Sequence, residues 1–151
     1  MRVIVQRVKQ SSVTIDNQIK SAIGIGLMIL VGIGDDDNKE DIDYIVKKVV
    51  NLRVFDDADG VMNRSVLDIQ GDILLVSQFT VMASTKKGCR PSYIRAARPE
   101  VSIPIYESLI NTLEATLGRP IGTGEFGADM KVELVNDGPV TIIIDSKQKD
   151  Y

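Results

Sequence analysis

The sequence predicts a compact α+β domain that is rich in strands and has two principal helices. Much of the N-terminal part alternates apolar and polar residues with the period of two that strands require, and two later segments place apolar residues on one helix face. No repeat, low-complexity tract or linker divides the 151 residues, and 44% hydrophobic residues suffice for one core. We expect antiparallel and mixed sheets that form a barrel-like core.

The N-terminal part of the chain predicts an antiparallel meander. Apolar and polar residues alternate over residues 2–8 and again over 12–15, and Asp16-Asn17 makes a turn into residues 19–23. Residues 26–33 are almost entirely apolar or glycine, which is typical of a strand buried on both faces.

The first helix is expected to follow the polar residues 35–38. Its apolar face is made of Ile42, Ile45, Val46, Val49 and Val50. Acidic residues stand near its start, and Lys47 and Lys48 stand near its end, which matches the charge preference of the helix dipole.

The middle of the chain predicts two more strands, a loop and the second helix. Residues 52–55 form a short strand and residues 72–79 a longer one, and residues 80–98 form a polar loop. Pro99 opens a helix that Gly118 ends. The apolar stripe of this helix is Tyr106, Leu109, Ile110, Leu113 and Leu117.

The last part of the chain predicts a final pair of strands. Residues 130–135 and 140–145 are the two strands, and the turn-forming residues 136–139 lie between them. We assign residues 1–145 to one domain and residues 146–151 to a frayed tail.

The composition restricts the chemistry. The chain has no histidine, the usual general base near neutral pH, so a Ser-His-Asp or Cys-His mechanism is excluded. One cysteine and no histidine leave only carboxylates as metal ligands, and we expect no metal and no cofactor. Any catalysis must therefore use hydroxyls, carboxylates, main-chain groups or the substrate itself.

Charge and hydropathy indicate the surroundings of the protein. The net charge of −3 argues against a broad basic surface that wraps nucleic acid, so any RNA contact is local and DNA is not expected as a partner. The first residues do not resemble a signal peptide, and the longest apolar stretch is too short to cross a bilayer. We expect a cytoplasmic protein with no membrane partner.

Several motifs closely resemble those of the D-aminoacyl-tRNA deacylases. The strongest are Ser77-Gln78-Phe79-Thr80 and Asn136-Asp137-Gly138-Pro139-Val140-Thr141. Further matches follow in the same order as in that family, namely Gln6-Arg7-Val8, Met62-Asn63, Gly88 with Arg90-Pro91-Ser92, and Phe126-Gly127-Ala128-Asp129-Met130. The resemblance covers residues 1–145.

The resemblance implies a homodimer with each active site at the dimer interface. The catalytic segment Ser77 to Thr80 of one subunit would face a Gly-cis-Pro element, Gly138-Pro139, from the other. Arg7 would support that element, Gln78 would hold the loop geometry, and Met130 would belong to the substrate-binding residues.

The implied activity is hydrolysis of the ester bond of D-aminoacyl-tRNA, a chiral proofreading step in translation quality control. Two main-chain carbonyls at Gly138-Pro139 would hold the substrate ammonium and exclude an L side chain, and glycyl-tRNA mischarged on tRNA(Ala) would pass this filter. Thr80 is a candidate nucleophile, but no base exists to activate it. We favour assistance from the tRNA 2′-hydroxyl, with a main-chain amide near Phe79 stabilising the oxyanion.

A basic cluster follows the catalytic segment. Its members are Lys86, Lys87, Arg90, Arg95 and Arg98. A solvated loop is the ordinary interpretation of such a cluster, and the functional one is contact with acceptor-end phosphates, chiefly by Lys86, Lys87 and Arg90. Two other functions stay open, namely an esterase or amidase of free D-amino acid derivatives and a noncatalytic RNA-binding domain.

Overall fold

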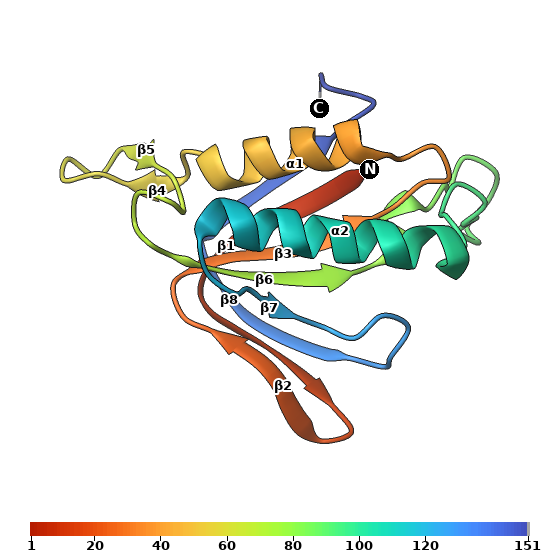
Figure 1. Ribbon diagram of the computed structural model, residues 1–151, viewed down its shortest axis with the longest axis horizontal. Coiled ribbons are helices and arrows are strands. Elements are labelled where there is room, and N and C mark those ends of the chain that lie inside the picture. The colour runs from red at the N-terminus through yellow and green to blue at the C-terminus, as the bar shows by residue number, and fades with distance from the viewer. Residues whose placement is uncertain (151) are drawn as a thin grey trace.

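The computed structural model describes residues 1–150, and its main feature is one six-stranded sheet covered on one face by two helices (Figure 1). The strands are β1 (Arg2–Ile15), β2 (Gln18–Ile23), β3 (Gly26–Gly32), β6 (Asp72–Ser77), β7 (Gly122–Thr123) and β8 (Lys131–Asp145). The helices are α1 (Lys39–Asn51) and α2 (Pro99–Leu117), and β4 (Phe55–Asp56) pairs with β5 (Met62–Arg64) in a separate ribbon. The predicted α+β class with two principal helices is confirmed.

The long strand β1 organises the sheet. Its first half pairs with β3, its second half pairs with β2, and β8 runs antiparallel along its whole other edge. The pairing of β3 with β6 is parallel, so the sheet is mixed. The Ser21 hydroxyl on β2 donates to the Thr123 carbonyl on β7 at 2.7 Å, which links the two ends of the sheet into a nearly closed barrel, as predicted.

Two apolar cores lie on the two faces of this sheet. Leu27, Ile29 and Val31 of β3 pack toward the helices, and Met28 between them faces the interior of the curled sheet. Successive residues of a strand point to opposite faces, so a strand buried on both sides must be apolar throughout. This explains the uninterrupted apolar run that the sequence shows at residues 26–33.

The helix ends follow local capping rules. Asn38 and Asp41 form a capping box at the start of α1, in which each side chain accepts a hydrogen bond from the other residue's main chain. Pro99 stands at the start of α2, and Gly118 ends it in a left-handed conformation with φ of 72°. Neither helix of the described chain combines the length and the apolar character that crossing a bilayer requires.

The predicted final strand pair is wrong, because residues 131–145 form one strand. Gln6 of β1 pairs with Thr141 and Val8 pairs with Asn136, so Arg7 alone faces the four residues 137–140. The turn-forming residues therefore bulge out of a continuous strand instead of reversing the chain. We call residues 137–140 the bulge.

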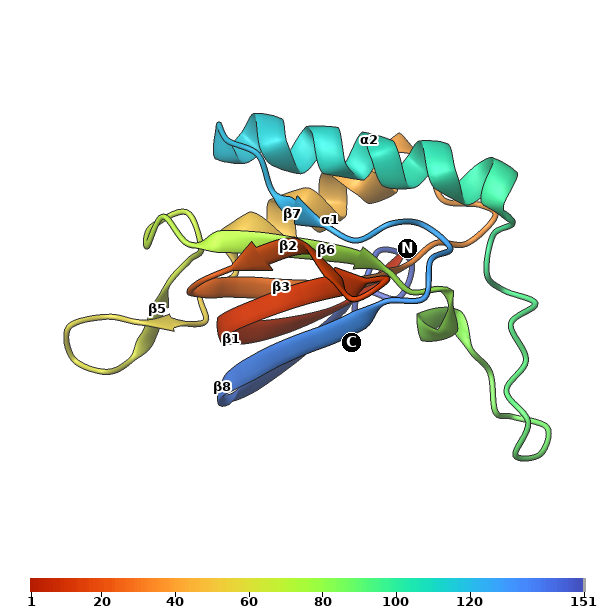
Figure 2. The same ribbon diagram turned by 90° about the horizontal axis from the view of Figure 1, so that it is seen from below.

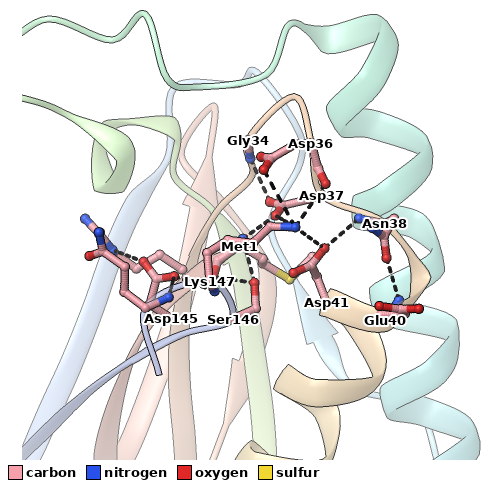
Figure 3. A network of polar contacts seen from close by, with 12 residues as sticks. Met1, Gly34, Asp36, Asp37, Asn38, Glu40, Asp41, Asp145, Ser146 and Lys147 are labelled. Carbon is pink, nitrogen blue, oxygen red and sulfur yellow. Dashed lines mark hydrogen bonds and ion pairs between the residues drawn. The ribbon is translucent and has the colours of Figure 1, made fainter. Parts of the chain in front are cut away.

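The predicted frayed tail is anchored over its first residues. The Ser146 hydroxyl accepts a hydrogen bond from the Met1 ammonium at 2.9 Å, and that ammonium also pairs with buried Asp37 (Figure 3). Lys147 binds the Asp41 carboxylate at 2.9 Å. Contacts with Met1 and with Asp41 of α1 thus hold Ser146 and Lys147, which belong to the segment predicted to be frayed. Tyr151, the end of the predicted tail, lies outside the described residues.

Candidate active site

A cleft of about 340 Å³ opens where β3 and β6 end. These two strands are parallel, so their last residues lie at the same edge of the sheet. The walls come from the end of β3, the end of β6, the start of α2 and the segment before β8. Among the residues that line the cleft are Ser77, Gln78, Phe79, Ser102, Phe126 and Met130.

The segment that follows β6 turns sharply at the cleft. The predicted strand 72–79 ends at Ser77, and the 3-10 helix η1 (Phe79–Met82) follows. The main-chain N–H of Gln78 still donates to the Val31 carbonyl at 2.8 Å, and the Gln78 side chain donates to the Thr80 hydroxyl oxygen. Within residues 1–150, the main-chain N–H of Phe79 has no acceptor, as expected at the first position of a helix.

The Thr80 hydroxyl has no base beside it. Its hydrogen-bond partner among residues 1–150 is the Gln78 amide, which donates to it and removes no proton. Ser77, Gln78 and Phe79 line the cleft, whereas Thr80, the next residue, does not. The geometry therefore gives Thr80 a supporting position rather than the environment of an activated nucleophile.

Tyr106 connects helix α2 to the strand that ends in the cleft. Its buried hydroxyl donates to the Leu75 carbonyl at 2.9 Å. Burial raises the pKa of Tyr106 to about 12, and a main-chain contact with Ser77 opposes that rise. The phenol is therefore neutral near pH 7. The sequence predicts Tyr106 only as a member of the apolar stripe of α2, and no sequence pattern indicates its hydrogen bond to β6.

The opposite wall of the cleft is apolar. The Met130 sulphur accepts the main-chain N–H of Glu125 at 3.4 Å, and a side chain at Gly124 would meet that sulphur at 2.5 Å. Phe126 packs against Tyr106 with ring centroids 6.1 Å apart. Buried Ser102 at the start of α2 donates to the Arg98 carbonyl at 3.0 Å. This wall suits a flat, apolar group such as a nucleobase.

Arg7 holds the bulge of β8. Its Nε donates to the Asp137 carbonyl at 3.0 Å, and its Nη1 donates to the Val54 carbonyl at 2.6 Å. Within the bulge the Gly138-Pro139 peptide bond is cis, and both residues are exposed. Gly138 has a φ of 124°, which L side chains rarely adopt, and a side chain there would also come within 2.9 Å of the Arg7 guanidinium, so the bulge favours glycine at this position.

The bulge and the cleft lie apart within one chain. Arg7 pairs with Leu27 near the start of β3, and Leu27 in turn pairs with Ile73 on β6. Ser77 follows Ile73 by four residues on that strand, which corresponds to about 13 Å along the strand direction. The structure thus brings Ser77, Gln78, Phe79 and Met130 together, and it places Arg7, Gly138 and Pro139 elsewhere.

Residues 83–98, which connect η1 to α2 and carry the basic cluster, project away from the sheet (Figure 2), and we call them the basic loop. Two main-chain hydrogen bonds between Ser84 and Ser92, of 2.8 and 2.9 Å, fix its base. The loop carries the exposed residues Lys86, Lys87 and Arg90. No group of three or more Cys, Asp or Glu side chains that could hold a metal ion occurs among residues 1–150.

Comparisons with known proteins agree over almost the whole chain. The family model described as D-Tyr-tRNA(Tyr) deacylase matches residues 4–145. A D-aminoacyl-tRNA deacylase of Bacteroides fragilis is 64% identical over 150 residues, which cover 99% of this chain and all of the relative. A D-aminoacyl-tRNA deacylase of Flavobacterium psychrophilum is 60% identical over the same shares.

Two solved structures share the fold. One, described as a c-Myc DNA Unwinding Element Binding Protein, has a TM-score of 0.92 and 42% identity over 96% of this chain and 98% of its own. The other, a probable eukaryotic D-amino acid tRNA deacylase, has a TM-score of 0.81 over 95% of this chain and 97% of its own, and its 17% identity makes it a likeness of fold alone.

Proposed function

This chain belongs to the D-Tyr-tRNA(Tyr) deacylase family, and on that premise we propose that its cleft binds the terminal aminoacyl-adenosine of D-aminoacyl-tRNA and hydrolyses the ester bond. The products are a free D-amino acid and an uncharged tRNA. The observation that carries this proposal is the cleft itself, in which polar Ser77 and Gln78 stand opposite apolar Phe126 and Met130. Such a site can hold an ester on one side and a nucleobase on the other.

The complete site is shared between two copies of the chain. The resemblance requires Gly138-Pro139 beside the catalytic segment, whereas within one chain the two are offset by about 13 Å along the strand direction and lie on different strands. A second copy related by a two-fold axis can bring its own bulge to the cleft, and by symmetry it receives the first copy's bulge in return. Exposure of Gly138 and Pro139 supports this arrangement, because no part of residues 1–150 covers them.

The bulge acts as the filter for chirality. The carbonyls of Gly138 and Pro139 accept hydrogen bonds from the substrate ammonium, and the cleft holds the ester carbonyl, so two of the four substituents of the α-carbon have fixed positions. An L side chain is then driven into the main chain of the bulge, and a D side chain points outward. Glycine has no side chain to exclude, so glycyl-tRNA is also hydrolysed, and a protein inert toward glycyl-tRNA would contradict a purely steric filter.

The chemistry relies on the substrate and on main-chain groups. The 2′-hydroxyl of the terminal adenosine assists attack of water on the ester carbonyl, and cleavage yields the carboxylate and the tRNA 3′-hydroxyl. The unpaired N–H of Phe79 supports its role in stabilising the oxyanion, because it can donate without breaking an existing hydrogen bond. The chain has no histidine, so an imidazole cannot act as the general base.

The basic loop binds phosphates of the acceptor end. Lys86, Lys87 and Arg90 form no ion pair within residues 1–150, so their charges are free for a ligand. Each such contact releases counterions, so KM for charged tRNA rises with salt, and three contacts on single-stranded RNA give a slope of about 2 in log–log form. A KM independent of salt would contradict this role.

Mixing two defective variants tests the shared site. Arg7→Met loosens the bulge, and Gln78→Ala disturbs the cleft, so each homodimer contains two damaged sites. Each mixed dimer contains one undamaged site, made of the cleft of the first variant and the bulge of the second. Equal mixing with subunit exchange therefore restores about one quarter of wild-type activity. If every site lies within one chain, mixing restores nothing.

A further inference from the structure

We propose that the side chains of Phe79 and Tyr93 form a stacking surface for the unpaired nucleotides that precede the terminal adenosine of tRNA. This inference rests on the proposed function and extends it, because it assigns a second contact region outside the cleft. Stacking on aromatic rings is the usual way in which proteins hold unpaired RNA bases without reading their sequence.

The two rings are exposed although they are large and apolar. Phe79 has 56% and Tyr93 has 40% of its surface accessible, and their ring centroids lie 5.0 Å apart in an edge-to-face arrangement. The other aromatic side chains among residues 1–150, namely Tyr44, Phe55, Tyr106 and Phe126, are buried or half-buried. The pair is therefore the exception among the described aromatic side chains of the single chain, and exposed aromatic residues mark binding surfaces. Phe79 also lines the cleft that receives the partner's bulge in the proposed dimer, so Tyr93, which does not line the cleft, is the ring to test.

The pair connects the cleft to the basic loop. Phe79 lines the cleft, and Tyr93, whose ring contacts that of Phe79, belongs to the basic loop. The backbone beside Tyr93 is held in place, because Ser92 forms two hydrogen bonds with Ser84 and the Tyr93 carbonyl accepts from the Ala96 N–H at 2.9 Å. Nucleotides next to the terminal adenosine would pass over this fixed pair.

The charge around the pair favours RNA as the occupant. Residues 84–98 contain five basic residues and no acidic one, in a chain with a net charge of −3. A second copy packed symmetrically on this loop would bring the two sets of five cations together, which costs energy. Aromatic rings beside unpaired cations are the combination that single-stranded nucleic acid binds.

The test compares two substrates and three variants. D-tyrosyl-tRNA contains the preceding nucleotides, and 3′-O-D-tyrosyl-adenosine lacks them. We expect Tyr93→Ala to lower kcat/KM for D-tyrosyl-tRNA about tenfold more than it lowers kcat/KM for the D-tyrosyl-adenosine ester. Tyr93→Phe keeps the ring and should retain the ratio, and Tyr44→Ala on α1 is a matched aromatic control away from the loop.

Binding of uncharged tRNA gives a readout that does not depend on hydrolysis. A loss of affinity of about tenfold in Tyr93→Ala, with Tyr93→Phe like wild type, supports the stacking surface even for a protein that cleaves no ester. Unchanged affinity overturns it. An equal loss of kcat/KM on both substrates also overturns it, because the ring then supports the cleft. A change of molecular mass in light scattering overturns it as well, because the ring then belongs to a subunit contact.

Discussion

Replacement of Arg7 by methionine tests how the bulge of β8 is held. Methionine keeps an unbranched apolar stem but removes the donors that bind the carbonyls of Asp137 and Val54 at 3.0 and 2.6 Å. The Arg7 side chain is only 11% exposed, so water replaces these hydrogen bonds incompletely. Hydrogen bonds from a charged donor contribute about 1.5–3 kcal/mol each, and partial solvation of the bulge reduces the sum to about 2–4 kcal/mol.

The assay is urea unfolding together with hydrolysis of D- and L-aminoacyl-tRNA. A loss of 2–4 kcal/mol lowers the urea midpoint by about 1–2 M for a small domain. The selectivity for D over L should fall as well, because the bulge no longer has a fixed position. Arg53→Met is the control: among residues 1–150 the hydrogen-bond partner of the exposed Arg53 side chain is Asn63 on the ribbon, at 2.9 and 2.8 Å, and its loss should cost less than about 1 kcal/mol.

Two results would refute the reasoning about Arg7. A variant with the wild-type urea midpoint would show that other contacts hold the bulge. A destabilised variant with unchanged selectivity for D over L would show that the bulge is structural and does not act as the filter.

Three further substitutions have expected outcomes. Thr80→Ala should keep kcat within about tenfold of wild type, because the hydroxyl has no base; a loss of several orders of magnitude in single-turnover hydrolysis would restore the nucleophile model. Tyr106→Phe should cost about 1 kcal/mol in urea unfolding at pH 7, because the Leu75 carbonyl loses a donor. The pKa of Tyr106 is about 12 in the folded protein and near 10 in the unfolded chain, so the free energy of unfolding of the wild type falls as pH rises from 10 to 12. The phenylalanine variant should lack this pH-dependent loss. Parallel plots of unfolding free energy against pH for the two proteins would contradict the assigned pKa. Burial raises the pKa of Asp145, but hydrogen bonds from the main-chain amides of residues 148 and 147 and from Arg2 outweigh it and hold that pKa below its ordinary value. The stability this carboxylate contributes is present above the unfolded value near 4 and is lost as pH falls through the lowered pKa, so Asp145→Asn should flatten the acid side of the stability curve, and an unchanged slope would contradict the assignment.

The periodicity of the sequence was sufficient for most of the fold. Residues 26–33 were predicted as a buried strand because both faces of β3 meet a core, and the stripe from Ile42 to Val50 predicted α1 because those side chains face the sheet. Both signals are local, so they can be recognised without knowledge of the rest of the chain.

The errors arose where distant parts of the chain decide the structure. The residues 136–139 favour a turn, and the same residues also suit a bulge. The chain does not reverse direction at these residues, because β1 is long enough to pair with both halves of β8. Ser146 is likewise anchored by Met1, at the other end of the sequence, and no local pattern could indicate that contact.

The candidate site was predicted in part for a similar reason. The motif that contains Gln78 identified the cleft segment, and the structure gathers it with Met130. The distance between Gly138 and the cleft within one chain depends on the strand register, which the sequence does not display. The exposed ring of Tyr93 was missed because exposure at a loop position has no sequence signature.

The decisive measurement compares the hydrolysis of D-tyrosyl-tRNA with that of L-tyrosyl-tRNA, with and without a chelator. We expect rapid loss of the D ester, survival of the L ester, and the same rates when the chelator is present. Equal loss of both esters would contradict the filter at Gly138-Pro139, and survival of both would contradict the proposed hydrolysis itself.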